Sequence, residues 1–281
     1  MKRIRALLAA TASVFMTAVD TSAQTPVATS VFSYADLADR ALAAPVALTA
    51  TISDAIRVEP ERAAGLQPGQ ARFYVEADAA TLIRGPAGLP PRVRYLVDVP
   101  LGPKGKAPKL RKQQVLILAR PVPNRAGELQ LVARDAQIPL TPEIDERVRA
   151  ILTEAVRQDA PPSITGIASA FHVPGAIPGE GETQIFLSTR DNRPVSLNIL
   201  RRPGQDRQWS IALSEIVDEA ARPPARDTLL WYRLACGLPR ELPQAMTAEL
   251  DTQAAEAARD DYRFVLQQLG PCGRSRAVSR S

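Results

Sequence analysis

The chain has 281 residues, of which 45% are hydrophobic and 23% are charged, and its formal net charge is +5 at neutral pH. These proportions are ordinary for a globular protein and exclude a disordered chain, and the length suffices for one large domain or two small ones. The mild positive charge does not argue for nucleic acid as a partner.

Residues 1–23 have the three parts of a cleavable secretory signal peptide. Residues 1–5 are basic, residues 6–18 carry no charge, and residues 21–23 are small enough for a cleavage site. A membrane anchor is the alternative, but the uncharged segment would span only about 20 Å as a helix, against a hydrocarbon core of about 30 Å. We therefore expect a periplasmic or secreted protein, and no later segment predicts a transmembrane span in the mature chain.

The next residues predict a linker and then a small β unit. Residues 24–45 form the linker, with a short helix over 33–44 that Ser33 can cap and Pro45 ends. Strands are predicted over 46–58, 73–84, 93–99, 114–119 and 129–138. Their spacing is typical of a small antiparallel barrel or sandwich. An oligonucleotide/oligosaccharide-binding type of barrel is one candidate, although the helix expected between its third and fourth strands is missing.

A helix closes this unit, because Thr141 is a good N-cap and Pro142 suits the first helical position. The β-barrel-like domain with its closing helix thus covers residues 46–160, and a second domain covers 161–272. The second domain has strands over 163–172, 183–189, 195–200 and 207–213, spaced as a four-stranded antiparallel meander. Helices over 229–235 and 244–269 complete an α+β fold, and the polar residues 273–281 predict a disordered tail.

Cys236 and Cys272 are the only cysteines of the chain. In an oxidising compartment the simplest expectation is one structural disulfide, with free thiols as the alternative. A straight helix over 244–269 would be about 39 Å long, whereas a disulfide needs Cα atoms within about 7 Å. The cysteines can meet only if the segment before this helix runs back along it, or if the helix is broken.

Two phrases of the sequence carry a family resemblance. Residues 231–239, Trp-Tyr-Arg-Leu-Ala-Cys-Gly-Leu-Pro, and residues 170–175, Ala-Phe-His-Val-Pro-Gly, resemble those of an uncharacterised family of exported bacterial proteins with no known activity. The resemblance covers most of the mature chain and implies an exported protein. It carries over no catalytic or binding residue.

No catalytic, metal-binding or cofactor motif stands out. His172 is the only histidine, and Ser169 lies three residues before it on one predicted strand, so their side chains should point to opposite faces. A half-buried structural histidine is therefore expected. Glu180 and Glu182 lie in a glycine-rich segment that is more typical of a solvated turn than of a calcium site. Residues 102–106 lack the spacing of a phosphate-binding loop, and we expect no metal and no cofactor.

One cluster of charges does stand out. All lysines of the mature chain fall within one short segment, and the chain has no acid from Val99 to Gly127. We call five residues the lysine cluster: Lys104, Lys106, Lys109, Arg111 and Lys112. Hydrated ammonium groups on a loop suit an anionic surface such as phospholipid headgroups, lipopolysaccharide phosphates or acidic glycan. A solvated loop whose charges deter aggregation is the commoner explanation of such a cluster.

These observations favour a non-catalytic binding or scaffolding protein of the cell envelope, with an anionic envelope component or an envelope protein as partner. The lysine cluster is its expected contact surface. The alternative is a hydrolase of envelope polymers that uses a carboxylate pair, which a deep cleft with two acids from different strands would favour. A structural assembly factor is a third hypothesis and predicts a large exposed apolar patch.

Overall fold

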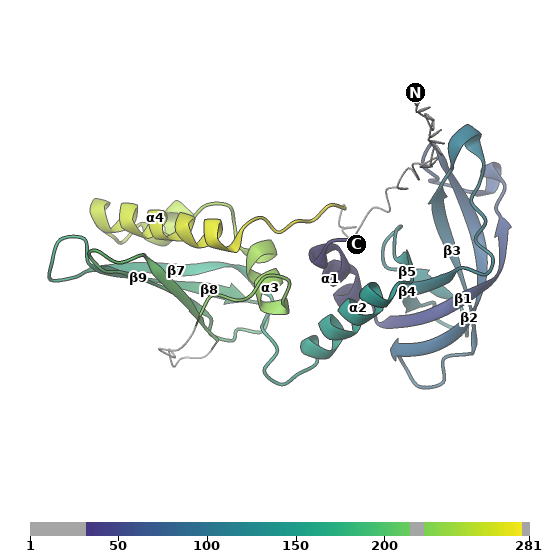
Figure 1. Ribbon diagram of the computed structural model, residues 1–281, viewed down its shortest axis with the longest axis horizontal. Coiled ribbons are helices and arrows are strands. Elements are labelled where there is room, and N and C mark those ends of the chain that lie inside the picture. Colours follow the sequence, from purple (N-terminus) through teal and green to yellow (C-terminus); the bar gives the residue numbers. More distant parts are fainter. Residues whose placement is uncertain (1–31, 214–221, 277–281) are drawn as a thin grey trace, which may run out of the picture. The chain divides into compact units, whose positions relative to one another are not determined.

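The structure, a computed structural model, describes residues 32–213 and 222–276, which belong to one compact unit. The predicted signal peptide and residues 24–31 lie outside the described residues. Both strands and helices are present, in a curled antiparallel half-barrel, a second antiparallel sheet and C-terminal helices (Figure 1). The predicted α+β class is therefore confirmed.

Helix α1 (Tyr34–Ala43) begins where the sequence predicts. The Ser33 hydroxyl accepts a hydrogen bond from the Asp36 amide, and the Asp36 carboxylate accepts one from the Ser33 amide, which makes a capping box. The chain leaves the helix at Ala44, whose backbone is extended, directly before Pro45.

The half-barrel sheet follows the chain order only in part. Its strands lie in the order β3-β2-β1-β4-β5, β6 pairs with β4 as well, and every one of these ladders is antiparallel. Register shifts along the β1–β2 ladder let this long strand pair curl. The strands are β1 (Val46–Arg57), β2 (Gln70–Arg84), β3 (Arg92–Pro100), β4 (Gln114–Pro121), β5 (Leu129–Leu131) and β6 (Gln137–Pro139).

Two details of this sheet differ from the sequence prediction or qualify it. The predicted fifth strand over 129–138 is two short strands, because a turn closed by the Ala136 amide on the Ala133 carbonyl interrupts it. The connection from β3 to β4 has only the single-turn 3₁₀ helix η2 (Pro103–Gly105). This agrees with the sequence, which predicts no α-helix between the third and fourth strands. Another such turn, η1 (Pro60–Arg62), lies between β1 and β2.

Alternating side chains of these strands fill the half-barrel. On β3 the buried residues are Val93, Tyr95, Val97 and Val99, while their neighbours face outward. They join an apolar cluster with residues of β1, β2 and β4. The Tyr95 hydroxyl crosses this interior and donates a 2.7 Å hydrogen bond to the Gln137 side chain.

Helix α2 (Pro142–Ala155), capped by Thr141 as predicted, leads to the second sheet. This sheet has the order β10-β9-β8-β7, which is the predicted meander, and helix α4 lies along one of its faces (Figure 1). Its strands are β7 (Ile164–Pro174), β8 (Gly181–Thr189), β9 (Ser196–Arg201) and β10 (Gln208–Ala212). The remaining helices are α3 (Leu229–Gly237), the 3₁₀ turn η3 (Gln244–Thr247) and α4 (Thr252–Leu269).

The cysteines form the predicted disulfide, and the long helix is shorter than predicted. Cys236 and Cys272 have Cα atoms 4.9 Å apart. Residues 244–251 are not part of the long helix, because Asp251 caps a new start by accepting from the Ala254 amide. The segment before α4 does run back along it, since the Tyr262 hydroxyl donates to the Pro239 carbonyl at 2.6 Å.

The apolar core does not stop at the domain boundary predicted near residue 160. A single cluster contains Leu37 of α1, Ile151 of α2, Ile185 of β8, Trp231 of α3 and Tyr262 of α4. Helices α1 and α2 therefore contact α3, which follows residue 160, and share this core with half-barrel residues such as Leu116. Of the described helices, none is both long and apolar enough to cross a membrane.

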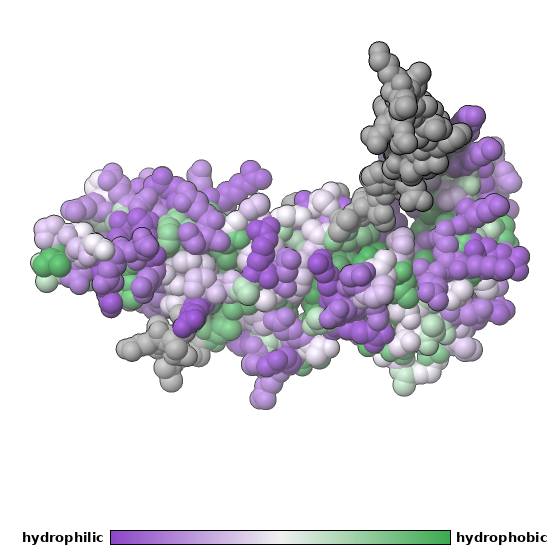
Figure 2. Space-filling view, in the orientation of Figure 1, coloured by the Kyte–Doolittle hydropathy of each residue, from purple (hydrophilic) through white to green (hydrophobic). Residues whose placement is uncertain are grey.

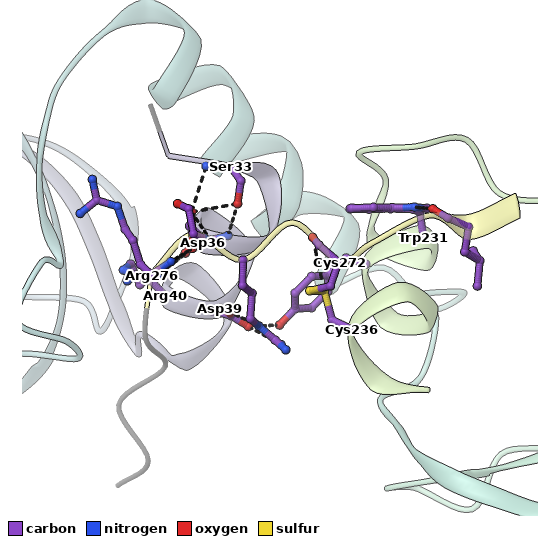
Figure 3. Close-up of a disulfide and its surroundings, with 12 residues drawn as sticks. Ser33, Asp36, Asp39, Arg40, Trp231, Cys236, Cys272 and Arg276 are labelled. Carbon is purple, nitrogen blue, oxygen red and sulfur yellow. Dashed lines mark hydrogen bonds and ion pairs between the residues drawn. A yellow bond between two sulfur atoms is a disulfide. The ribbon is translucent and has the colours of Figure 1, made fainter. Parts of the chain in front are cut away.

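The C-terminal residues are bound to α1 (Figure 3). The Asp36 carboxylate accepts hydrogen bonds from the Ser275 amide and hydroxyl and from the Arg276 amide, and Arg274 pairs with Asp39 at 2.6 Å. The expectation of a disordered tail from residue 273 does not hold for Arg274 to Arg276, and residues 277–281 lie outside the described residues. This segment is held by acids of α1 that lie far away in the sequence. Composition alone therefore could not show that the segment is ordered.

Candidate functional site

The lysine cluster lies on a well-anchored connection between β3 and β4. Leu110 is 5% exposed and packs into the half-barrel core from the middle of the cluster. Backbone hydrogen bonds tie both ends of the connection to the sheet, from Leu101 to Gly69 at 2.8 Å and from Lys112 to Ile52 at 2.8 Å. The side chains of the cluster are therefore presented from a folded scaffold.

Two lysines of this connection have a backbone conformation that is unusual for residues other than glycine. Lys104 has φ of 62° and Lys112 has φ of 71°, both in the left-handed region that favours glycine. A non-glycine residue there costs on the order of 1 kcal/mol. Lysine at both positions therefore places a charge where a glycine would favour stability.

All five residues of the lysine cluster are exposed, and among the described residues none of them takes part in an ion pair. On the outer face of the half-barrel, by contrast, three arginines are paired with acids across strands. Arg72 meets Asp98 at 2.6 Å, Arg94 meets Glu76 at 2.8 Å and Arg92 meets Asp78 at 2.9 Å. In Figure 2 the visible face of the half-barrel is covered mostly by hydrophilic residues. The lysine cluster is thus a local excess of uncompensated positive charge.

His172 belongs to a buried polar chain that links the second sheet to α4. The Thr183 hydroxyl donates to Asp261 Oδ2 at 2.5 Å, and His172 Nδ1 lies 2.8 Å from the same hydroxyl oxygen. Because the only hydroxyl proton goes to Asp261, His172 Nδ1 must carry a proton and donate to Thr183. Arg201 completes the chain by donating to Asp261 Oδ1 at 2.8 Å.

This arrangement supports a structural role for His172. The hydroxyl of Thr183 is fully engaged, so it is unsuited to act as a nucleophile. Ser169 lies on the opposite face, because the β7–β8 ladder runs without a register shift between Ser169 and His172. Burial lowers the pKa of His172, which favours the neutral ring. No sequence pattern indicates Thr183 and Asp261, because their contact depends on how α4 packs on the sheet.

Glu180 and Glu182 do not come together as a ligand pair. Glu180 accepts a hydrogen bond from the Ala176 amide at 3.1 Å and thereby closes the β7–β8 turn. Glu182 is exposed on β8. Within residues 32–213 and 222–276, no group of three His, Cys, Asp or Glu side chains is arranged to hold a metal ion.

A cavity of about 830 Å³ lies beside the half-barrel, between β3 and the segment around β5. It is lined by two acids, Asp98 of β3 and Glu128, which directly precedes β5, whereas the hydrolase alternative requires two acids from different strands. Both oxygens of Asp98 accept hydrogen bonds from Arg72, at 2.6 and 2.8 Å, and Glu128 pairs with Arg125 at 3.1 Å. Carboxylates engaged in this way are poorly placed to exchange protons with a substrate.

Comparisons with known proteins give no further guide to this site. No protein-family model matches the chain, and no curated protein matches its sequence. The resemblance to an exported bacterial family therefore stays a prediction, and the function has to be argued from the residues described above.

Proposed function

We propose that this protein is a non-catalytic binding or scaffolding protein of the cell envelope, in the periplasm or outside the cell, and that the lysine cluster contacts an anionic component there. The observation that carries the proposal is the set of five exposed cations without ion-pair partners among the described residues, on a connection anchored by Leu110. The predicted signal peptide and the disulfide support the compartment.

Phosphate-bearing headgroups are the ligands that this surface suits best. Lysine ammonium groups act as hydrated point charges that need no fixed geometry, which matches a fluid, anionic surface. Each lysine close to such a surface contributes about 1 kcal/mol of binding free energy, and this contribution falls off within a Debye length. Phospholipids and lipopolysaccharide share this chemistry, so the experiment has to separate them.

The test is cosedimentation of the mature protein with vesicles of phosphatidylglycerol and phosphatidylcholine, and in a separate arm with lipopolysaccharide aggregates. A variant with Lys104, Lys106, Lys109 and Lys112 all changed to Gln should bind roughly a thousandfold more weakly, from about 4 kcal/mol in total. Binding by the unchanged protein should also weaken steeply as salt is raised. The arm with the tighter binding identifies the source of the phosphate groups.

A matched control separates this surface from net charge. The control variant changes four exposed arginines outside the lysine cluster to Gln, namely Arg147, Arg202, Arg222 and Arg240. It removes the same charge and should keep most of the binding. Equal loss in both variants, or no loss in the lysine variant, contradicts the proposal. If the cluster serves only to deter aggregation, the lysine variant will aggregate while envelope binding stays the same.

A further inference from the structure

The half-barrel has an opening between β3 and β5. The two strands meet only at an isolated parallel bridge between Arg94 and Glu128, where the Arg94 amide donates to the Gly127 carbonyl at 2.8 Å. Beyond this bridge β3 has no ladder partner except β2, and β5 has none except β4, among the described residues. A closed barrel would have no such edges.

On β3 the free backbone groups can be assigned from the ladder. The Leu101 amide donates to Gly69 and the Ala79 amide donates to Pro91, at the two ends of the β2–β3 pair. In an antiparallel ladder the bonding residues alternate, so the odd-numbered residues of β3 bond to β2. The amide and carbonyl groups of Leu96 and Asp98 therefore point away from β2 and into the opening.

The same reasoning applies to β5. The Val132 amide donates to Leu118 at 3.1 Å and the Val122 amide donates to Glu128 at 3.0 Å, so the even-numbered residues bond to β4. The backbone groups of Leu129 and Leu131 then face the opening from the other side. The parallel bridge itself joins the Leu129 amide to the Arg94 carbonyl, so Leu131 keeps the free backbone groups on this side. The outward groups of Leu96 and Asp98 bond to no described backbone group.

The cavity of about 830 Å³ occupies this opening, and its lining carries more positive than negative charge. Four arginines line it against two acids: Arg72, Arg94, Arg125 and Arg134, with Asp98 and Glu128. Arg134 is exposed and takes part in no ion pair among the described residues. The exposed side chain of Leu96 adds an apolar contact next to the free edge.

We propose that this opening binds an extended acidic peptide segment of a partner protein, which adds a strand to the free edge of β3 at Leu96 and Asp98. The site is separate from the lysine cluster and goes beyond the function proposed above. Edge-bound strands gain affinity from main-chain hydrogen bonds, and here Leu96 and Asp98 offer donors and acceptors on alternate residues of β3. Arg72, Arg94 and Arg125 are already ion-paired, so Arg134 is the lining cation that favours an acidic side chain of the peptide. A glycan could fill the cavity but would not match the alternating backbone groups of a strand edge.

The experiment selects a displayed library of random heptapeptides on the folded, disulfide-bonded protein. We expect the enriched peptides to combine Asp or Glu with Val, Ile or Thr at alternating positions. Resynthesised peptides should lose binding when alternate amides are N-methylated, because methylation removes the donors that pair with an edge. Changing their acids to amides should weaken binding about tenfold.

Two variants test the site itself. Leu96→Pro removes an edge donor without removing a bond to β2, and proline is tolerated at such edge positions. Arg134→Glu reverses an exposed charge and carries little risk to folding, with Arg147→Glu on α2 as its matched control. Each of the first two should weaken the selected peptides at least about tenfold, and the control should not. Vesicle binding through the lysine cluster should be the same in all three.

The proposal is overturned if no peptides are enriched over those retained by the Leu96→Pro and Arg134→Glu double variant. It is also overturned if the enriched peptides bind Leu96→Pro and Arg134→Glu unchanged, or tolerate N-methylation at every position. An oligogalacturonate titration covers the other class of ligand. If this acidic glycan binds with dependence on Arg134 while no peptide is enriched, the opening is a glycan site and the peptide proposal is wrong.

Discussion

Changing Asp36 to Asn should weaken the attachment of the C-terminal segment to α1 and lower the stability of the whole protein. The Asp36 side chain is fully buried. Its Oδ2 accepts hydrogen bonds from the Ser33 hydroxyl at 2.9 Å and the Ser275 hydroxyl at 2.5 Å, and Oδ1 accepts from the Arg276 amide at 3.1 Å. Asparagine has the same size but turns one acceptor into a donor, which then faces other donors (Figure 3).

The magnitude follows from these contacts. Hydrogen bonds to a charged group contribute about 1.5 to 3 kcal/mol each, and the exchange to asparagine disrupts the bonds at one of the two oxygens. Leaving donors unpaired in a buried site brings the expected loss to about 3 to 5 kcal/mol. For a domain of this size that corresponds to a melting temperature lower by roughly 10 °C.

Urea unfolding at neutral pH measures this loss directly, and Asp54→Asn is the control because Asp54 is exposed. The control should change the unfolding free energy by less than about 0.5 kcal/mol. A loss below about 1 kcal/mol for Asp36→Asn would refute the reasoning, since a single charged hydrogen bond already exceeds it.

The pH dependence of Asp36 gives an independent check on the same site. Burial alone would raise the pKa of Asp36, but hydrogen bonds from Ser275, Ser33 and Arg276 outweigh it and lower the pKa below its usual value. The folded carboxylate therefore contributes stability above the unfolded pKa of about 3.9, and this contribution is lost as the pH falls through the lower folded pKa. The difference between the unchanged protein and Asp36→Asn should accordingly shrink in strong acid.

Three further predictions concern the disulfide, the anchor of the lysine cluster and the histidine. Replacing both Cys236 and Cys272 by Ala releases a link across a sequence separation of 36 and should cost about 4 kcal/mol in urea unfolding. Leu110→Ala should cost about 2 to 4 kcal/mol and speed hydrogen exchange of the amides in the β3–β4 connection, and unchanged exchange would show that Leu110 does not hold it. Because burial lowers the pKa of His172, the unfolded chain binds its proton more tightly, so stability should fall as the pH drops below about 6.5, and His172→Gln should flatten that part of the stability curve.

Most elements could be predicted because their limits are set by neighbouring residues. Ser33 and Thr141 cap the helices that follow them, and turn residues such as Gly204, with φ of 71°, separate the strands of the meander. The Ala-rich run predicts one long helix over 244–269, whereas a local signal within this range marks a later start. Asp251 is a strong N-cap directly before Thr252, and it could have shown where α4 begins.

The contacts that matter most for the site could not be predicted in this way, because they join residues far apart in the chain. Asp36 and Ser275 are 239 residues apart, and nothing near either residue indicates the other. The free edges of β3 and β5 depend on where the half-barrel fails to close, which no periodicity reports. The lysine cluster could be found because it is a matter of local composition, but its lack of ion pairs depends on the surrounding fold.

The two proposed contacts differ in the physics that would hold them, and this makes them separable in one protein. The lysine cluster would act through side-chain charges, so its binding should fall steeply with salt. The opening would act mainly through backbone hydrogen bonds at Leu96 and Asp98, which salt screens far less. The opening lies along β3, and the lysine cluster follows β3 directly. A protein that binds an anionic surface through the lysine cluster and a peptide through the opening would hold these two ligands close together. Such joining needs no catalytic group, so the two proposed contacts together would suit a scaffold.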